Sequence, residues 1–140
     1  MKKMITIATI ILAFATTNSF AQIKTPSAVV SSFERTFAKA ETPIWSAVTG
    51  LYRVDFSVNK ENLSAFFSAA GELIATSRDI APTQLPISLQ SSLEKHFGHY
   101  TVSSLFEIDQ NDGIFYYAKV NNQKSEILLK STSFGEWVTN

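Results

Sequence analysis

The sequence predicts an α+β fold: a tandem repeat of a helix followed by a four-stranded antiparallel sheet, with the helices packed on one sheet face. Residues 31–37 read SSFERTF, and residues 91–97, sixty positions later, read SSLEKHF. Each heptad has the pattern of a short amphipathic helix. About forty residues of alternating, strand-like sequence follow each copy. Agreement between the two halves in helix, strands and turns indicates an internal repeat.

A leader precedes the first repeat. Lys2 and Lys3 are followed by an apolar run from Met4 to Ala15, and small residues occupy the −3 and −1 positions of a cleavage site at Ser19 and Ala21. This is the pattern of a secretory signal peptide, and the apolar run is too short for a membrane anchor. We expect cleavage after Ala21 and a protein in the periplasm or secreted further, with no stable membrane insertion.

The domain organisation follows from the leader and the repeat. Residues 1–21 form the signal peptide, and residues 22–140 form a single domain made of two repeats, about 25–80 and 81–140. The chain has twelve basic and twelve acidic residues, so removal of Lys2 and Lys3 leaves ten against twelve and a formal charge of −2. A near-neutral surface argues against nucleic acid and anionic lipid as partners. The chain has no cysteine, so core packing must supply its stability.

The first repeat opens with Thr25 as helix cap and Pro26 as the first helical residue. Val30, Phe33 and Phe37 then form a one-sided apolar stripe. Four strands are expected after Pro43. They span residues 43–49, 51–58, 63–69 and 72–77, with turns at Gly50, 59–62 and 70–71.

The second repeat follows an irregular link at 78–84. A helix begins at Leu85-Pro86, carries Leu89, Leu93 and Phe97, and ends at Gly98. Strands are expected over 100–108, 114–120 and 125–131, with a short closing segment at 135–138. Asp112-Gly113 predicts a hairpin between the first two of them.

The first half also carries a spaced pattern of aromatic and glycine residues: Trp45, Gly50, residues 52–56 (YRVDF), Gly71-Glu72-Leu73 and Leu85-Pro86. In this it resembles the PepSY-like family of small exported bacterial proteins, which is similar in fold to the beta-lactamase-inhibitory protein. The resemblance covers about residues 29–139. It implies a non-enzymatic periplasmic module, proposed for the family to bind partners or inhibit peptidases, and it brings no catalytic residue. This chain lacks the disulfides of the namesake inhibitor.

Candidate binding residues lie on the outer face of the predicted sheets. If alternate residues such as Val54 and Phe56 pack under the helices, the intervening side chains face outward. Aromatic, arginine and charged residues together are typical of a protein-binding surface. These candidates are Arg53, Asp55, Phe66, Phe115, Tyr117 and Lys119.

No pattern indicates an enzyme, a cofactor or a metal. His96 and His99 could touch one ion, but no third ligand is evident beyond Glu94 and Glu107. No serine lies in a Gly-x-Ser-x-Gly elbow.

Three functions stay open. The first is a non-enzymatic exported binding module, an inhibitor or partner-binding protein whose partner is a periplasmic or extracellular protein or peptide. The second is a carrier of a small ligand or peptide, using an apolar pocket between helix and sheet lined by Phe33, Tyr52, Phe56 and Phe67. The third is self-association through an exposed strand edge such as that around Trp137.

Overall fold

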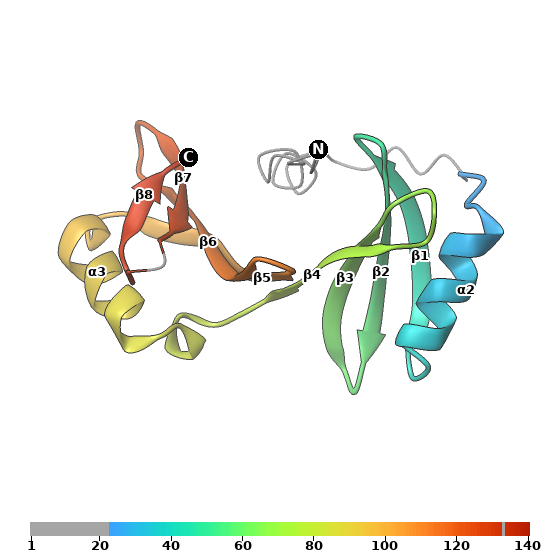
Figure 1. Ribbon diagram of the computed structural model, residues 1–140. Coiled ribbons are helices and arrows are strands. Elements are labelled where there is room, and N and C mark those ends of the chain that lie inside the picture. Colours follow the sequence, from blue (N-terminus) through green and yellow to red (C-terminus); the bar gives the residue numbers. More distant parts are fainter. Residues whose placement is uncertain (1–22, 133) are drawn as a thin grey trace. The chain divides into compact units, whose positions relative to one another are not determined.

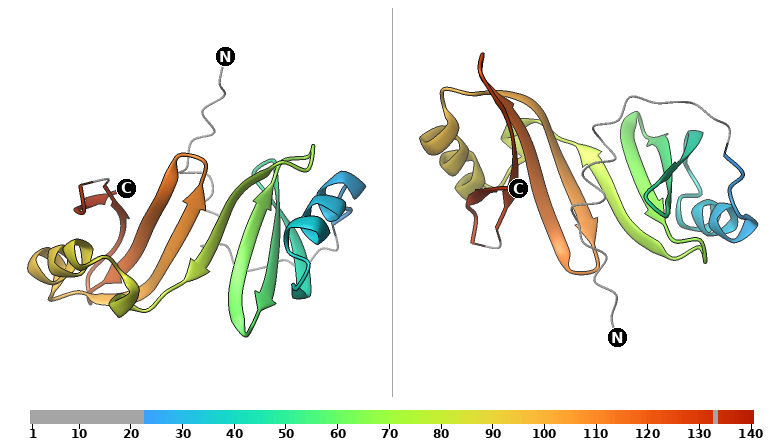
Figure 2. Two further views of the ribbon diagram at one scale, coloured as in Figure 1. Left: turned by 60° about the horizontal axis from the view of Figure 1, so that its bottom comes forward. Right: turned by 90° about the horizontal axis from the view of Figure 1, so that it is seen from above.

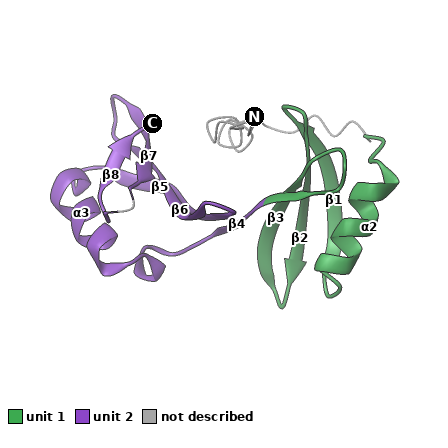
Figure 3. Ribbon diagram, viewed as in Figure 1, with its two compact units in different colours: residues 1–74 green, residues 75–140 purple. Residues whose placement is uncertain are grey.

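The computed structural model describes residues 23–132 and 134–140, which belong to two compact units (Figures 1 and 3). Unit 1 is Met1–Ile74 and unit 2 is Ala75–Asn140. The predicted signal peptide and its cleavage site lie outside the described residues. No helix in the described part of the chain is long and apolar enough to cross a membrane.

The strands form one eight-stranded antiparallel sheet, in the order β1 to β8. The predicted tandem repeat of a helix and a four-stranded sheet, with helices packed on one sheet face, is therefore wrong. The difference lies at β4 (Leu73–Asp79), because its residues Ala75–Asp79 pair with Phe106–Gln110 of β5. A four-stranded sheet would leave the backbone groups along this edge unpaired, and pairing with β5 satisfies them.

Unit 1 contains α2 (Ser27–Thr36), β1 (Glu41–Val48), β2 (Leu51–Val58), β3 (Glu61–Phe67) and the start of β4. The helix begins one residue later than predicted, because Pro26 has an extended ψ of 143° and occupies the N-cap position. Val29 and Phe33 are buried on the inner side of α2. Phe33 and the partly buried Phe37 of the predicted stripe pack on one face of the strands. Val29, and not the predicted Val30, joins them in the core.

An aromatic cluster closes the core of unit 1. The Phe33 ring lies 5.4 Å from the Trp45 ring, 5.1 Å from the Phe56 ring and 6.4 Å from the Phe67 ring, measured between centroids. All three pairs meet edge to face, the arrangement that aromatic quadrupoles favour. The cluster occupies the helix-side face of the strands in unit 1.

Position 71 must be a glycine, because of both its backbone conformation and the space around it. Its φ is +86°, and a Cβ atom built there would lie 2.6 Å from the carbonyl oxygen of Ala28 in α2. The turn before β4 therefore approaches the helix backbone more closely than any side chain permits.

Unit 2 contains the 3₁₀ helix η1 (Pro82–Gln84), α3 (Ile87–Phe97), β5 (Thr101–Gln110), β6 (Gly113–Asn121), β7 (Glu126–Ser131) and β8 (Trp137–Thr139). Leu89 and Leu93 of α3 pack against buried residues of the strands, including Leu105, Ala118 and Leu129. Each helix lies alongside the strands of its own unit in the two views of Figure 2. The predicted Asp112-Gly113 hairpin is present between β5 and β6.

Trp137 ties the last strand to the helix. Its indole Nε1 donates a hydrogen bond of 2.9 Å to the carbonyl oxygen of Leu89, and the side chain is buried. This bond uses the polar edge of a ring whose apolar body belongs to the core.

Candidate functional site

In unit 1, a polar cluster occupies the face of β2 and β3 opposite the aromatic core. Arg53 pairs across the strands with Phe66, and Asp55 pairs with Ser64. Arg53 Nε donates a 2.8 Å hydrogen bond to Asp55 Oδ1, and the Ser64 hydroxyl donates to the same oxygen. Arg53 Nη2 also lies 3.4 Å from the Ser64 hydroxyl oxygen. We call these four residues the Arg53 cluster.

Phe66 completes the Arg53 cluster, with its ring under the Arg53 guanidinium. The Arg53 guanidinium carbon lies 5.9 Å from the centre of the Phe66 ring, within the range of a cation–π interaction. Phe66 itself is fully buried, at 0% exposure. Arg53 and Asp55 are half-buried, so they are the members of the cluster that face solvent.

In unit 2, an aromatic–lysine cluster occupies the strand face opposite α3. The Lys130 ammonium lies 4.7 Å from the centre of the Phe115 ring and 5.8 Å from that of Tyr117. Tyr117 is paired with Lys130 on one side and with Phe106 on the other, and its ring stacks on Phe106 at 5.5 Å. We call these four residues the Lys130 cluster.

Lys119 lies on the same strand as Tyr117, two residues on, and is engaged elsewhere. Its ammonium forms an ion pair of 2.9 Å with Glu126 of β7. Both side chains are partly exposed, so water weakens this pair. Lys130 differs, because no carboxylate of the described residues lies within ion-pair distance of it.

Tyr117 is the unusual member of the Lys130 cluster. Its side chain is fully buried, and its hydroxyl oxygen has no hydrogen-bond partner among the described residues. Burial raises the pKa of Tyr117 well above its ordinary value of 10.0, because the phenolate would lose its hydration. The hydroxyl therefore stays protonated.

The structure thus places the six predicted site residues in two separate groups. Arg53, Asp55 and Phe66 meet in unit 1, and Phe115 and Tyr117 meet in unit 2, with Lys119 paired to Glu126. Each group lies on the strand face that the period-two pattern predicts. The pattern does not reveal that Phe66 and Tyr117 are buried.

The described residues show no metal centre. No group of three or more histidine, aspartate or glutamate side chains is placed to hold an ion within residues 23–132 and 134–140. His96 and His99 are both exposed at the end of α3, where the helix stops at Phe97.

The four residues expected to line a carrier pocket lie together in unit 1. Phe33, Phe56 and Phe67 are all buried and contact one another, and Tyr52 packs against them. These side chains pack into the core of unit 1, and Phe33 also lines a groove of about 240 Å³ beside α2.

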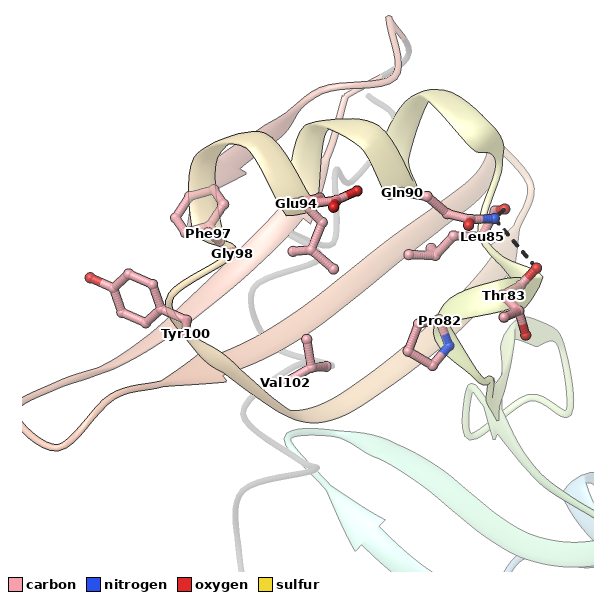
Figure 4. Close-up of a pocket in the computed structure, with 10 residues that line it drawn as sticks. Pro82, Thr83, Leu85, Gln90, Glu94, Phe97, Gly98, Tyr100 and Val102 are labelled. Atoms are coloured by element: carbon pink, nitrogen blue, oxygen red, sulfur yellow. Dashed lines mark hydrogen bonds between the residues drawn. The ribbon is translucent and has the colours of Figure 1, made fainter.

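A surface groove lies beside α3 in unit 2 (Figure 4). Its volume is about 290 Å³. The side chains of Leu85 and Val102 lie on its inner side, Phe97 and Tyr100 stand at one end, and Thr83 and Gln90 stand at the other. Sequence reasoning missed this groove, because it forms only where the link at 82–85 returns against the helix. The Pro82 and Pro86 pair is the one local signal of such a bend.

No protein-family model matches the chain, and no curated protein matches it. Solved structures do match. A DUF2874 family protein from Bacteroides ovatus aligns with a TM-score of 0.76 at 19% identity, over 83% of this chain and 86% of that chain. A protein provisionally assigned to the periplasm, from Bacteroides eggerthii, aligns with a TM-score of 0.77 at 16% identity, over 83% and 87%. A BLIP-like protein from Bacteroides fragilis aligns with a TM-score of 0.73 at 14% identity, over 85% and 88%. The chain therefore has a BLIP-like fold.

Proposed function

We propose that this chain is a non-enzymatic, exported binding module that captures a protein or peptide in the periplasm or outside the cell. The Lys130 cluster carries the proposal. An ammonium held over two aromatic rings, with no carboxylate of the described residues within ion-pair distance, is suited to receive an acidic side chain of a partner. Aromatic residues beside a cation are also typical of binding hot spots.

The Arg53 cluster supplies a second contact surface of similar chemistry. Arg53 presents a planar guanidinium that is already oriented by Asp55 and Ser64. An arginine held in this way loses little further conformational freedom when a partner binds. Its test is separate from that of Lys130, because the two clusters belong to different units.

The likeness in fold supports this class of function. The chain shares its fold with a BLIP-like protein and with a protein provisionally assigned to the periplasm. We also propose that the chain belongs to the PepSY-like, beta-lactamase-inhibitor-like group. We propose further that it is exported through a leader cleaved after Ala21 and that it has no catalytic role. A fold alone does not define a partner, so the partner must be found by experiment.

The test is affinity capture with the mature chain, beginning at Gln22, from native periplasmic extract. Lys130→Ala and Arg53→Ala are compared with Lys124→Ala, a matched change at an exposed turn residue. We expect one or a few proteins to be retained by the parent and by Lys124→Ala, and at least one of them to be lost with Lys130→Ala. Phe66 and Tyr117 are avoided because they are buried, and their truncation would destabilise the fold by about 3–5 kcal/mol.

The proposal fails if no protein is enriched over blank resin, or if every variant retains the same set. Unfolding temperatures of the variants within a few degrees of the parent show that a loss of capture is a loss of binding. If the captured protein is an enzyme, its activity with and without the mature chain decides whether the module inhibits it.

A further inference from the structure

The groove beside α3 is large enough to hold a side chain of a bound molecule. A cavity of about 150 Å³ holds a benzene ring, and sites for drug-sized molecules occupy about 300–1,000 Å³. At about 290 Å³, the groove has room for one or two large apolar side chains. Leu85 and Leu93 are buried, and Val102 is half-buried, so its floor is apolar and well fixed.

Among the described residues that line the groove, the charged side chain is that of Glu94. Glu94 is exposed on the helix at its rim and forms no ion pair with the described residues. The Gln90 side-chain nitrogen is already used, because it lies 2.8 Å from the Leu85 carbonyl oxygen and 3.4 Å from that of Thr83. None of the described residues that line the groove is a lysine or an arginine. A complementary ligand therefore carries a positive charge.

Two aromatic rings stand at one end of the groove. Phe97 and Tyr100 are packed edge to face with centroids 5.9 Å apart, and both are half-buried. In Figure 4 they lie beyond Glu94 along the helix, with the Tyr100 hydroxyl directed outward. The exposed part of such a pair offers a ring face to a guanidinium or ammonium group.

A smaller groove in unit 1 has the same combination of groups. It has a volume of about 240 Å³ and is lined by Phe33, Glu34, Phe37 and Trp45 among others. Glu34 and Phe37 precede Glu94 and Phe97 by sixty residues. Among the residues that the structure describes, no lysine or arginine lines either groove. An acidic rim over an apolar and aromatic floor therefore occurs twice in this chain.

We propose that the groove beside α3 binds a segment of a partner protein in which arginine or lysine lies next to a large apolar residue. The apolar side chain fills the space over Leu85 and Val102. The cation meets the Glu94 carboxylate and lies against the ring of Phe97 or Tyr100. This site uses none of the residues of the Lys130 or Arg53 clusters, so it stands or falls independently of the function proposed above.

The test uses blocked dipeptides and the ¹⁵N-labelled mature chain from Gln22, followed by amide chemical shifts. Acetyl-Leu-Arg-amide is compared with acetyl-Leu-citrulline-amide, which has nearly the same shape without the charge. We expect the arginine peptide to shift amides of residues 83–102 saturably, and the citrulline peptide to bind about two- to fivefold more weakly, as expected for an exposed ion pair. Acetyl-Leu-Glu-amide should cause no saturable shift there.

Three variants locate the effect. Glu94→Gln should make the arginine and citrulline peptides bind equally in unit 2. Glu34→Gln should leave the shifts of residues 83–102 unchanged, as should Glu61→Gln at an exposed strand-end residue. The proposal is overturned if the arginine peptide causes no saturable shift in this range, or if citrulline binds as tightly in the parent. Shifts that grow with protein concentration alone would identify a second copy as the occupant and would also overturn it.

Discussion

The ammonium of Lys130 lies 4.7 Å from the centre of the Phe115 ring, on the strand face of unit 2 that α3 does not cover. The two residues belong to neighbouring strands, β7 and β6. Their contact therefore links side chains across the sheet and holds the ammonium in place.

Lys130→Ala should lower the free energy of unfolding by about 0.5–1 kcal/mol, the value of a partly exposed cation–π contact. Urea denaturation followed by tryptophan fluorescence measures it. Lys124→Ala, at an exposed turn residue, should change stability by less than about 0.5 kcal/mol. Equal effects of the two changes would show that the rings contribute nothing to the position of Lys130.

Arg53 and Asp55 should show a coupling free energy of about 0.5–1 kcal/mol in a double-mutant cycle made with alanine. The Asp55 side chain is 41% exposed, so solvent screens the pair and keeps the value small. The same cycle in 0.5 M salt should give a smaller coupling. A coupling that is unaffected by salt would indicate that hydrogen bonds through Ser64, and not charge, hold the cluster together.

Gly71→Ala should destabilise the protein more than Gly50→Ala, by about 1–2 kcal/mol. Both glycines have a positive φ, +86° and +80°, so the backbone strain of the two changes is similar. They differ in space, because a Cβ at Gly71 meets the Ala28 carbonyl oxygen at 2.6 Å and one at Gly50 meets nothing within 4 Å. Thermal unfolding of both variants measures the difference, and equal losses would refute the close approach of the turn to α2.

Tyr117→Phe should raise the free energy of unfolding by about 1–2 kcal/mol at neutral pH, because it removes a buried hydroxyl without a hydrogen-bond partner among the described residues. The effect should depend on pH. The folded-state pKa of Tyr117 lies above the ordinary value of 10.0. Above pH 10 the unfolded chain therefore loses this proton while the folded chain keeps it, and stability falls as the pH rises.

The Tyr117→Phe variant has no such proton to lose. Its free energy of unfolding should therefore exceed that of the parent by a margin that grows between pH 9 and pH 11. Urea denaturation at each pH measures the difference. Other tyrosines titrate equally in both proteins and cancel. A difference that is constant with pH would mean that the Tyr117 phenolate is solvated in the folded state.

Local patterns predicted the elements well. The spacing of Phe33 and Phe37 placed the helix, although Val29 and not the predicted Val30 lies in the core. The alternation of residues 51–58 placed β2 and the side chains of its inner face. Both signals come from neighbours in sequence, which is where hydrophobic periodicity carries information.

Pairing between distant strands was not predictable in the same way. The sequence ends a strand near Ser77, but β4 continues to Asp79, where it pairs with Phe106 of β5. The sequence of residues 73–79 does not specify which strand pairs with them, since the backbone groups of an unpaired edge can bond to any strand of suitable shape. The burial of Phe66 and Tyr117 and the groove beside α3 also escaped prediction, because alternation and helical spacing do not show how the elements pack in three dimensions.

β4 has a consequence for how the chain unfolds. Leu73, at its start, packs in the core of unit 1, while Ala75–Asp79 are paired with β5 in unit 2. A fragment that ends at Ile74 therefore lacks the strand's continuation, and one that begins at Ala75 lacks its anchor. Slowly exchanging amides in this strand would report the melting of both halves at once, which makes it the natural place to measure their cooperativity.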